Sequence, residues 1–92
     1  MPYIRVEARE YFIKVLELLK HTAISDTGEL NYLFTEIINQ YHVTNAKCYK
    51  TMNDVVGALE SCKAEYQRRV VGPYEDKKIA LNSDVYSEEV IR

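Results

Sequence analysis

Residues 65–78, EYQRRVVGPYEDKK, gather the side chains of this chain that are best suited to binding an anion. Arg68 and Arg69 carry planar guanidinium groups, which match phosphate or carboxylate oxygens in pairs. Tyr66 and Tyr74 flank them and can stack on a base or donate a hydroxyl group. A helix that begins at the proline of this stretch would add free backbone N–H groups, which also bind phosphate. These residue types and their spacing indicate a nucleotide or another phosphate as the ligand.

The same stretch also fits a solvated helix surface that binds no ligand. Residues three or four apart share a helix face, so Glu65 can pair with Arg68 or Arg69. Exposed ion pairs of this kind each contribute well under about 1 kcal/mol. Runs of charge on a long helix are often no more than this. The residues alone leave both interpretations open.

The segment GELNY, residues 28–32, is typical of the start of a helix. Glu29 would then lie near the positive end of the helix, where an acidic side chain is stabilising. In a functional interpretation, Glu29 and Asn31 would bind a base edge or an arginine of a partner instead. Asn53 and Asp54 similarly resemble capping residues of a later helix.

The sequence offers little support for catalysis. It contains none of the motifs typical of serine hydrolases, zinc proteases, phosphate-binding loops or deaminases. Cys48 with His42, or Cys62 with His21, would supply a nucleophile and a base, but nothing in their spacing selects either pair. The cysteines and histidines also lack the spacing of a metal site. We therefore expect no enzymatic activity, no metal and no cofactor.

Composition restricts the class of protein. The 92 residues are 47% apolar and 28% charged, which predicts one globular domain over residues 1–92 with one modest core. A formal net charge of −2 argues against a dedicated DNA binder. The opening MPYIRVEARE lacks the apolar segment of a signal peptide, and no apolar run approaches the ~20 residues that span a bilayer. We expect a cytoplasmic protein that binds neither DNA nor a membrane.

Apolar periodicity predicts an all-α fold, a small helical bundle of three main helices. The first is expected over residues 6–22. The second is expected over residues 30–41, after a polar break in which Asp26 or Thr27 caps it. Residues 42–51 show no period, which predicts a loop.

The third main helix, over residues 51–71, is long for a domain of this size. It would measure about 30 Å at ~1.5 Å per residue, so its far end should leave the core and meet a partner chain or a ligand. Gly57 inside it costs about 1 kcal/mol relative to alanine, which predicts close approach by another helix or a ligand. Gly72-Pro73 breaks or kinks this helix. A short C-terminal helix over residues 73–81 and a polar tail complete the chain.

The segments GELNY, GALESCKAEYQRRVVGPYEDKKI and NSDVY, taken together, resemble a family of short phage and bacterial proteins of uncharacterised type. The resemblance covers residues 28–86 and is densest over residues 57–86. Ser83 stands where the family pattern has glycine, and Gln67 replaces a frequent aromatic residue. Among small helical phage proteins, the sequence is similar to the tetrameric sponges that bind the cyclic nucleotide signals of CBASS-type defence and catalyse nothing.

That similarity implies a symmetric homo-oligomer that holds a cyclic dinucleotide, such as cGAMP, between its chains. The phosphates would be contacted by cationic side chains, namely Lys63, Arg68 and Arg69. The bases would stack on tyrosines, namely Tyr66, Tyr74 or Tyr86. The protein would then be a non-enzymatic phage immune-evasion protein that sequesters a signal in the cytoplasm of the host cell.

Two other functions compete with this one. In a homo-oligomeric adaptor without a nucleotide ligand, the arginine pair would meet Glu75 and Asp76 across a two-fold interface, because such contacts match acidic and basic patches reciprocally. Alternatively, these charged residues would pair with a host protein. In a helix-turn-helix regulator, the third main helix would enter the major groove of DNA. The long loop expected before that helix and the acidic net charge disfavour the regulator.

Overall fold

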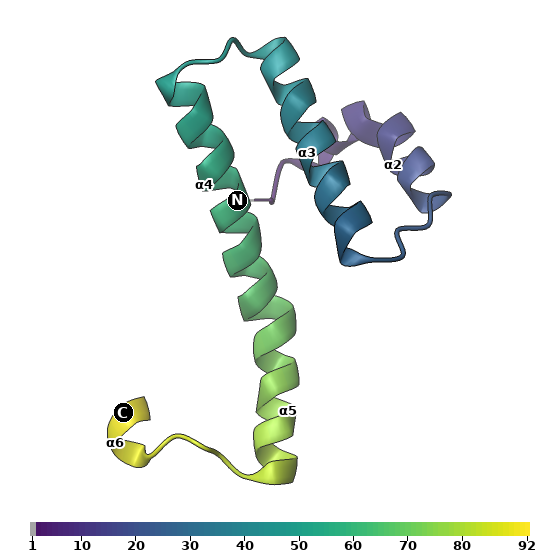
Figure 1. Ribbon diagram of the computed structural model, residues 1–92. Coiled ribbons are helices and arrows are strands. Elements are labelled where there is room, and N and C mark those ends of the chain that lie inside the picture. Colours follow the sequence, from purple (N-terminus) through teal and green to yellow (C-terminus); the bar gives the residue numbers. More distant parts are fainter. Residues whose placement is uncertain (1) are drawn as a thin grey trace.

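The computed structural model describes residues 2–92 and shows helices joined by short loops, with no strand in that range (Figure 1). The all-α fold expected from the sequence is confirmed. The elements in chain order are α1 (Val6–Arg9), η1 (Glu10–Phe12), α2 (Ile13–Lys20), α3 (Thr27–Thr44), α4 (Tyr49–Tyr66), η2 (Gln67–Val71), α5 (Gly72–Asn82) and α6 (Glu88–Ile91).

The first predicted helix is present but irregular. It begins at Val6 and ends at Lys20, and a 3-10 turn, η1, separates α1 from α2. Phe12 at the end of that turn has φ −100° and ψ 10°, outside the α-helical region. The Thr22 hydroxyl donates to the Leu18 carbonyl oxygen (2.6 Å) just beyond the helix. The segment is therefore two short α-helices joined by a 3-10 turn. The apolar spacing predicted its position correctly, but not its irregularity.

Helix α3 begins where the polar break predicted. Asp26 is its N-cap, and the Asp26 carboxylate accepts a hydrogen bond from the backbone N–H of Glu29 (2.8 Å). The Glu29 carboxylate in turn accepts from the backbone N–H of Ser25 (2.7 Å). Two backbone donors at the helix end are thus satisfied reciprocally, in the manner of a capping box. The interpretation of GELNY as a helix start is confirmed.

The loop predicted over residues 42–51 is wrong in extent, because both neighbouring helices extend into it. At the end of α3, the backbone N–H and the side-chain amide of Asn45 both donate to the Tyr41 carbonyl oxygen. Cys48 is the N-cap of α4, and its N–H donates to the Thr51 hydroxyl (2.9 Å). Only residues 45–48 remain outside the helices. Asp54 consequently lies within α4 and does not cap it.

Helices α4 and α5 join through η2 into one helical rod over residues 49–82, about 50 Å long at ~1.5 Å per residue (Figure 1). The turn η2 is π-helical, and the Gly72 N–H donates to the Gln67 carbonyl oxygen, five residues back. In an α-helix, the ring of Pro73 would clash with the carbonyl of Arg69. The wider turn accommodates the ring, so Gly72-Pro73 changes the hydrogen-bonding register without ending the rod.

This geometry corrects the expectation of an open helix start at Pro73. The chain enters α5 from a helical turn, and the Gly72 N–H is already bonded within that turn. A Cβ added at Gly72 would lie 3.2 Å from the Gln67 carbonyl oxygen, which favours glycine here. The free backbone N–H groups proposed for phosphate binding are therefore not supplied by this position.

The bundle is open. Within residues 2–92 no side chain is buried, so the single chain has none of the core expected from its composition. The radius of gyration is 17.9 Å, whereas a compact domain of this length has one of about 12 Å. Helix α3 and the first half of α4 run antiparallel, while α5 extends away from them and the chain then turns back to α6 (Figure 1). The apolar stripes exist as predicted, but they are only partly covered.

Replacing Asp26 with alanine should lower the free energy of unfolding by about 1 kcal/mol, because it removes the cap of α3. Asp26→Asn is the matched control, since asparagine also caps well and should change stability little. Urea unfolding at one fixed protein concentration measures both variants. Equal stability of the alanine and asparagine variants would contradict the role of Asp26.

Candidate functional site

The stretch first singled out lies on the outer half of the long rod. Lys63 and Tyr66 are at the end of α4, Arg68 and Arg69 are in the π turn η2, and Tyr74 is in the first turn of α5. These five candidate residues therefore occupy one continuous helical segment, although a break or kink was expected at Gly72-Pro73 between the arginines and Tyr74.

Tyr86 lies apart from that segment, in the loop between α5 and α6. Its N–H donates to the Asp84 carboxylate (3.0 Å). Together with Glu75 and Lys78 of α5, it lines a hollow of about 410 Å³. The Lys78 ammonium lies 5.4 Å from the centre of the Tyr74 ring, which is within cation–π range. The sixth candidate residue is thus near the C-terminal half of α5 rather than beside the arginines.

The N-terminal arm reaches the arginines through Tyr3. The Tyr3 hydroxyl donates to the Glu65 carboxylate (2.7 Å) and accepts a long hydrogen bond from the Arg69 guanidinium (3.5 Å). The Arg68 guanidinium lies 3.1 Å from both oxygens of the same carboxylate. The ion pair between Glu65 and Arg68 is confirmed, whereas nothing local in the sequence indicated Tyr3, 62 residues away from Glu65.

Glu65 is the electrostatic centre of this cluster. Its side chain is only 19% exposed, while that of Arg68 is 65% exposed. The hydrogen bond from Tyr3 and then the pairing with Arg68 hold the pKa of the Glu65 carboxyl below its usual value. The ionised carboxylate therefore holds the Arg68 guanidinium directly and reaches the Arg69 guanidinium through the Tyr3 hydroxyl, while the Arg68 side chain stays largely in water.

The π turn also determines which side chains share a face of the rod. In a regular α-helix, Tyr66 and Tyr74 would point roughly 80° apart. The extra residue in η2 turns α5 back by about 100°, which brings the two tyrosines to within about 20° of each other. Both rings are more than half exposed. Two stacking surfaces therefore lie along one side of the rod.

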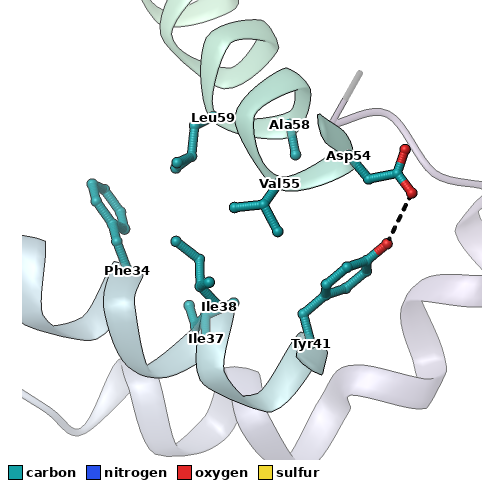
Figure 2. A pocket seen from close by; sticks show the side chains of 8 residues that line it. All are labelled: Phe34, Ile37, Ile38, Tyr41, Asp54, Val55, Ala58 and Leu59. Atoms are coloured by element: carbon teal, nitrogen blue, oxygen red, sulfur yellow. Dashed lines mark hydrogen bonds between the residues drawn. The ribbon is translucent and has the colours of Figure 1, made fainter. Parts of the chain in front are cut away.

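A second candidate site is an apolar groove of about 360 Å³ between α3 and α4. Figure 2 shows side chains from the two helices facing each other across it. Its lining residues are Phe34, Ile37, Ile38 and Tyr41 from α3 and Asp54, Val55, Ala58 and Leu59 from α4. The sequence identified both stripes as apolar helix faces, but periodicity does not show that the space between them stays open.

One polar cluster closes an end of this groove. The Tyr41 hydroxyl donates to the Asp54 carboxylate (3.3 Å; Figure 2). The Lys50 ammonium lies 2.9 Å from the same oxygen. The hydrogen bond from Lys50 lowers the pKa of the Asp54 carboxyl, while partial burial and the charge of Asp54 raise the pKa of Tyr41. The remaining wall is apolar, so the groove suits an apolar side chain or helix face.

The cysteines and Gly57 have simple surroundings. The Thr51 hydroxyl lies 3.6 Å from the Cys48 sulfur, and hydrogen bonds from Thr51 lower the pKa of that thiol. Both Cys48 and Cys62 are exposed free thiols. A Cβ added at Gly57 would meet no atom within 4 Å, so the close approach expected there does not come from the same chain.

Two features are absent from the described residues 2–92. They contain no group of three His, Cys, Asp or Glu side chains placed to hold a metal ion. None of the helices in this range combines the length and the hydropathy needed to cross a bilayer.

These features define an open all-helical protein with an apolar groove and a charged, tyrosine-bearing helical rod. Residues 1–85 match the family model described as "Domain of unknown function (DUF6899)", and the chain belongs to that family. Tyr86 falls just beyond the matched residues. No curated protein matches the chain. No solved structure matches it either.

Replacing Tyr3 with phenylalanine should lower the melting temperature at neutral pH, because it removes the hydroxyl that bridges Glu65 and Arg69. The pKa of Glu65 is lowered in the folded state, so its contribution is present above the unfolded pKa, near 4.5, and is lost as the pH falls through the folded pKa.

Thermal melting between pH 7 and pH 3 would check this expectation. The difference between Tyr3→Phe and the parent should shrink as Glu65 becomes protonated. The control is Tyr32→Phe, because Tyr32 is exposed and its substitution removes no hydrogen bond of the hydroxyl. A difference that stays constant over this range would rule out Glu65 as the partner of Tyr3.

Proposed function

We propose that the protein is a non-enzymatic interaction module that functions as a homo-oligomer. The observation that carries this proposal is the surface of the single chain. Its accessible area is 8683 Å². A compact monomer of 10.7 kDa has about 5,500 Å². Each chain therefore exposes roughly 3,000 Å² more than a stable monomer would.

An excess of this size matches obligate assembly. A standard protein–protein interface covers about 800 Å² on each partner, while permanent homodimers bury about 1,000–2,500 Å² on each. Roughly 3,000 Å² per chain requires a strongly intertwined dimer or more than one interface per copy. Closed symmetric oligomers of identical chains are the commonest way to provide these.

The exposed surface is also apolar enough to form interfaces between chains. Large apolar side chains remain exposed along every long helix, including Ile37 (64%) in the groove and Val56 (66%) on α4. Soluble monomers rarely expose contiguous apolar patches of more than a few hundred Å². Covering these faces with other copies of the chain would remove the apolar area from water at about 25 cal/mol per Å².

Sedimentation equilibrium of the purified chain at micromolar concentration tests the proposal. We expect a discrete oligomer and a melting temperature that rises with protein concentration. A chain that stays monomeric and still melts cooperatively would overturn it.

Ile37→Lys should weaken assembly at least tenfold, because it places a charge in the apolar groove. Val43→Lys is the matched control, since Val43 is also on α3 and exposed (76%) but does not line the groove. Sedimentation equilibrium compares the two variants at equal concentration. Equal dissociation constants for both variants would show that the groove is not part of an interface.

Binding of a cyclic dinucleotide, which the phage-sponge resemblance implies, is a second candidate function. One observation favours it: η2 and its flanks present Arg68, Arg69, Tyr66 and Tyr74 on exposed helix surface. π-helical turns occur often at functional sites. Guanidinium groups and tyrosine rings together provide the contacts that phosphates and bases need. In this case the oligomer would sequester the nucleotide without turnover, as an immune-evasion protein in the cytoplasm of a host cell.

Thermal melting against a panel of cyclic di- and trinucleotides tests this second function. A ligand that raises the melting temperature and is recovered intact would support it. Arg69→Ala should abolish that shift, whereas Arg92→Ala, which removes an arginine paired with Glu88 in α6, should keep it. No shift with any nucleotide of the panel would count against this function, and recovery of degraded nucleotide would indicate an enzyme.

A further inference from the structure

We propose that the long rod pairs with the same rod of a second copy, antiparallel, with the two-fold axis passing beside Arg69. This inference rests on the homo-oligomer proposed above and adds the segment, direction and register of one interface. Residues 56–82 of each chain would lie along each other, over about 40 Å.

An apolar seam runs along the rod and is only partly covered by α3 near one end. From Met52 to Tyr74 its members follow one another at intervals of three or four residues, the spacing of helices that pack as coiled coils. They are Met52, Val55, Leu59, Cys62, Tyr66, Val70, Tyr74 and Leu81. Leu81 follows Tyr74 after seven residues, with Lys77 and Lys78 at the intervening positions. Val55 and Leu59 line the groove beside α3. Beyond them the seam is exposed, up to 77% at Leu81.

The π turn keeps this seam continuous. The extra residue in η2 places Tyr74 and Leu81 within about 40° of Tyr66 around the rod axis. In an uninterrupted α-helix the same residues would drift roughly 60–80° away from it. The π turn that accommodates Pro73 therefore also maintains one apolar face from α4 into α5.

Charge decides the direction and the register. In an antiparallel pair centred on residue 69, Lys63 of each copy lies opposite Glu75 of the other, on the same flank of the seam. Glu60 lies opposite Lys78 in the same register. A parallel, in-register pair would instead set Lys63 against Lys63 and Glu75 against Glu75, which is repulsive.

Shape fits the same register. The π turn covers Gln67–Val71 and is centred on residue 69, so the two wide turns would lie at one level. Gly72, which has no side chain, would lie opposite Tyr66 and leave space for its ring. Each Arg69 near the axis is accompanied by the Glu65 carboxylate of its own chain, since the Tyr3 hydroxyl bridges the two. Like charge at the axis is thereby balanced.

The surface area is consistent with this contact plus another. A helix pair of this length provides an interface of ordinary size, about 800 Å² per chain, and the excess surface is roughly 3,000 Å². Most of the groove between α3 and α4, apart from its edge at Ala58 and Leu59, would remain for a different interface. One rod contact and one groove contact per chain would generate a closed assembly larger than a dimer.

A charge-swap cycle tests the register. Lys63→Glu and Glu75→Lys should each weaken assembly about tenfold, because every two-fold interface contains the altered pair twice. The double variant Lys63→Glu with Glu75→Lys should restore the parent dissociation constant. Lys47→Glu, outside the paired segment, is the control for net charge. Assembly that is unaffected by the single swaps, or not restored by the double one, would overturn the register while leaving the oligomer intact.

Oxidation of Cys62 tests the direction independently. In the antiparallel register the two Cys62 residues are about 21 Å apart along the rods, too far for a disulfide, which needs Cα atoms within about 7 Å. In the parallel arrangement they would lie opposite each other in the seam. Mild oxidation of a Cys48→Ser chain should leave it uncrosslinked, whereas Arg69→Cys in the Cys48→Ser background should crosslink readily. A Cys62 dimer would overturn the antiparallel direction, and a monomeric parent chain would overturn the oligomer itself.

Discussion

The uncovered apolar surface of the single chain is the physical constraint on which the rest of the structure depends. An amphipathic helix in water is stabilised mainly by burying its apolar stripe, and helices of this length are marginal alone. Here the stripes are present on α2, α3 and α4, yet the chain folds without burying a side chain among residues 2–92. Capping, local ion pairs and the Tyr3 contact order the helices, while the apolar stripes stay largely exposed.

Pro73 has an influence well beyond its own position. Because it lacks an N–H and its ring excludes a carbonyl four residues back, the chain adopts a π turn at Gln67–Val71. That turn rotates α5 relative to α4 and aligns Tyr66 with Tyr74. Proline usually ends a helix, but here it is part of a turn that keeps one exposed face continuous along the helical rod of residues 49–82.

Residue types and their spacing predicted the elements that depend on contacts between residues close together in the sequence. The Asp26 cap and the amphipathic stripe of α3 both follow from residue type and spacing, and the structure contains them. The prediction of a loop over residues 42–51 was wrong because it rested on the absence of an apolar period. Polar residues at the ends of a helix do not show such a period. A hydrogen bond from Asn45 caps the end of α3, and a hydrogen bond between Cys48 and Thr51 caps the start of α4. An apolar pattern does not reveal either of these polar contacts.

Other features were beyond the reach of a single sequence. The contact of Tyr3 with Glu65 joins parts of the chain that are distant in the sequence. No pattern in the residues around either of them predicts this contact. The candidate residues Lys63, Tyr66, Arg68, Arg69 and Tyr74 do share a segment, but their common face depends on the π turn. Periodicity showed which faces of α3 and α4 are apolar, yet it does not distinguish a filled core from an open groove.

The scarcity of contacts between distant parts of the chain has a kinetic consequence. Helices and local pairs form within microseconds, whereas docking of separate chains is bimolecular and slows with dilution. In the homo-oligomer proposed above, cooperative stability would be acquired at the encounter of chains, and the folded fraction in a cell would increase steeply with the amount synthesised. Newly made chains that have not met a partner would be the species exposed to proteases.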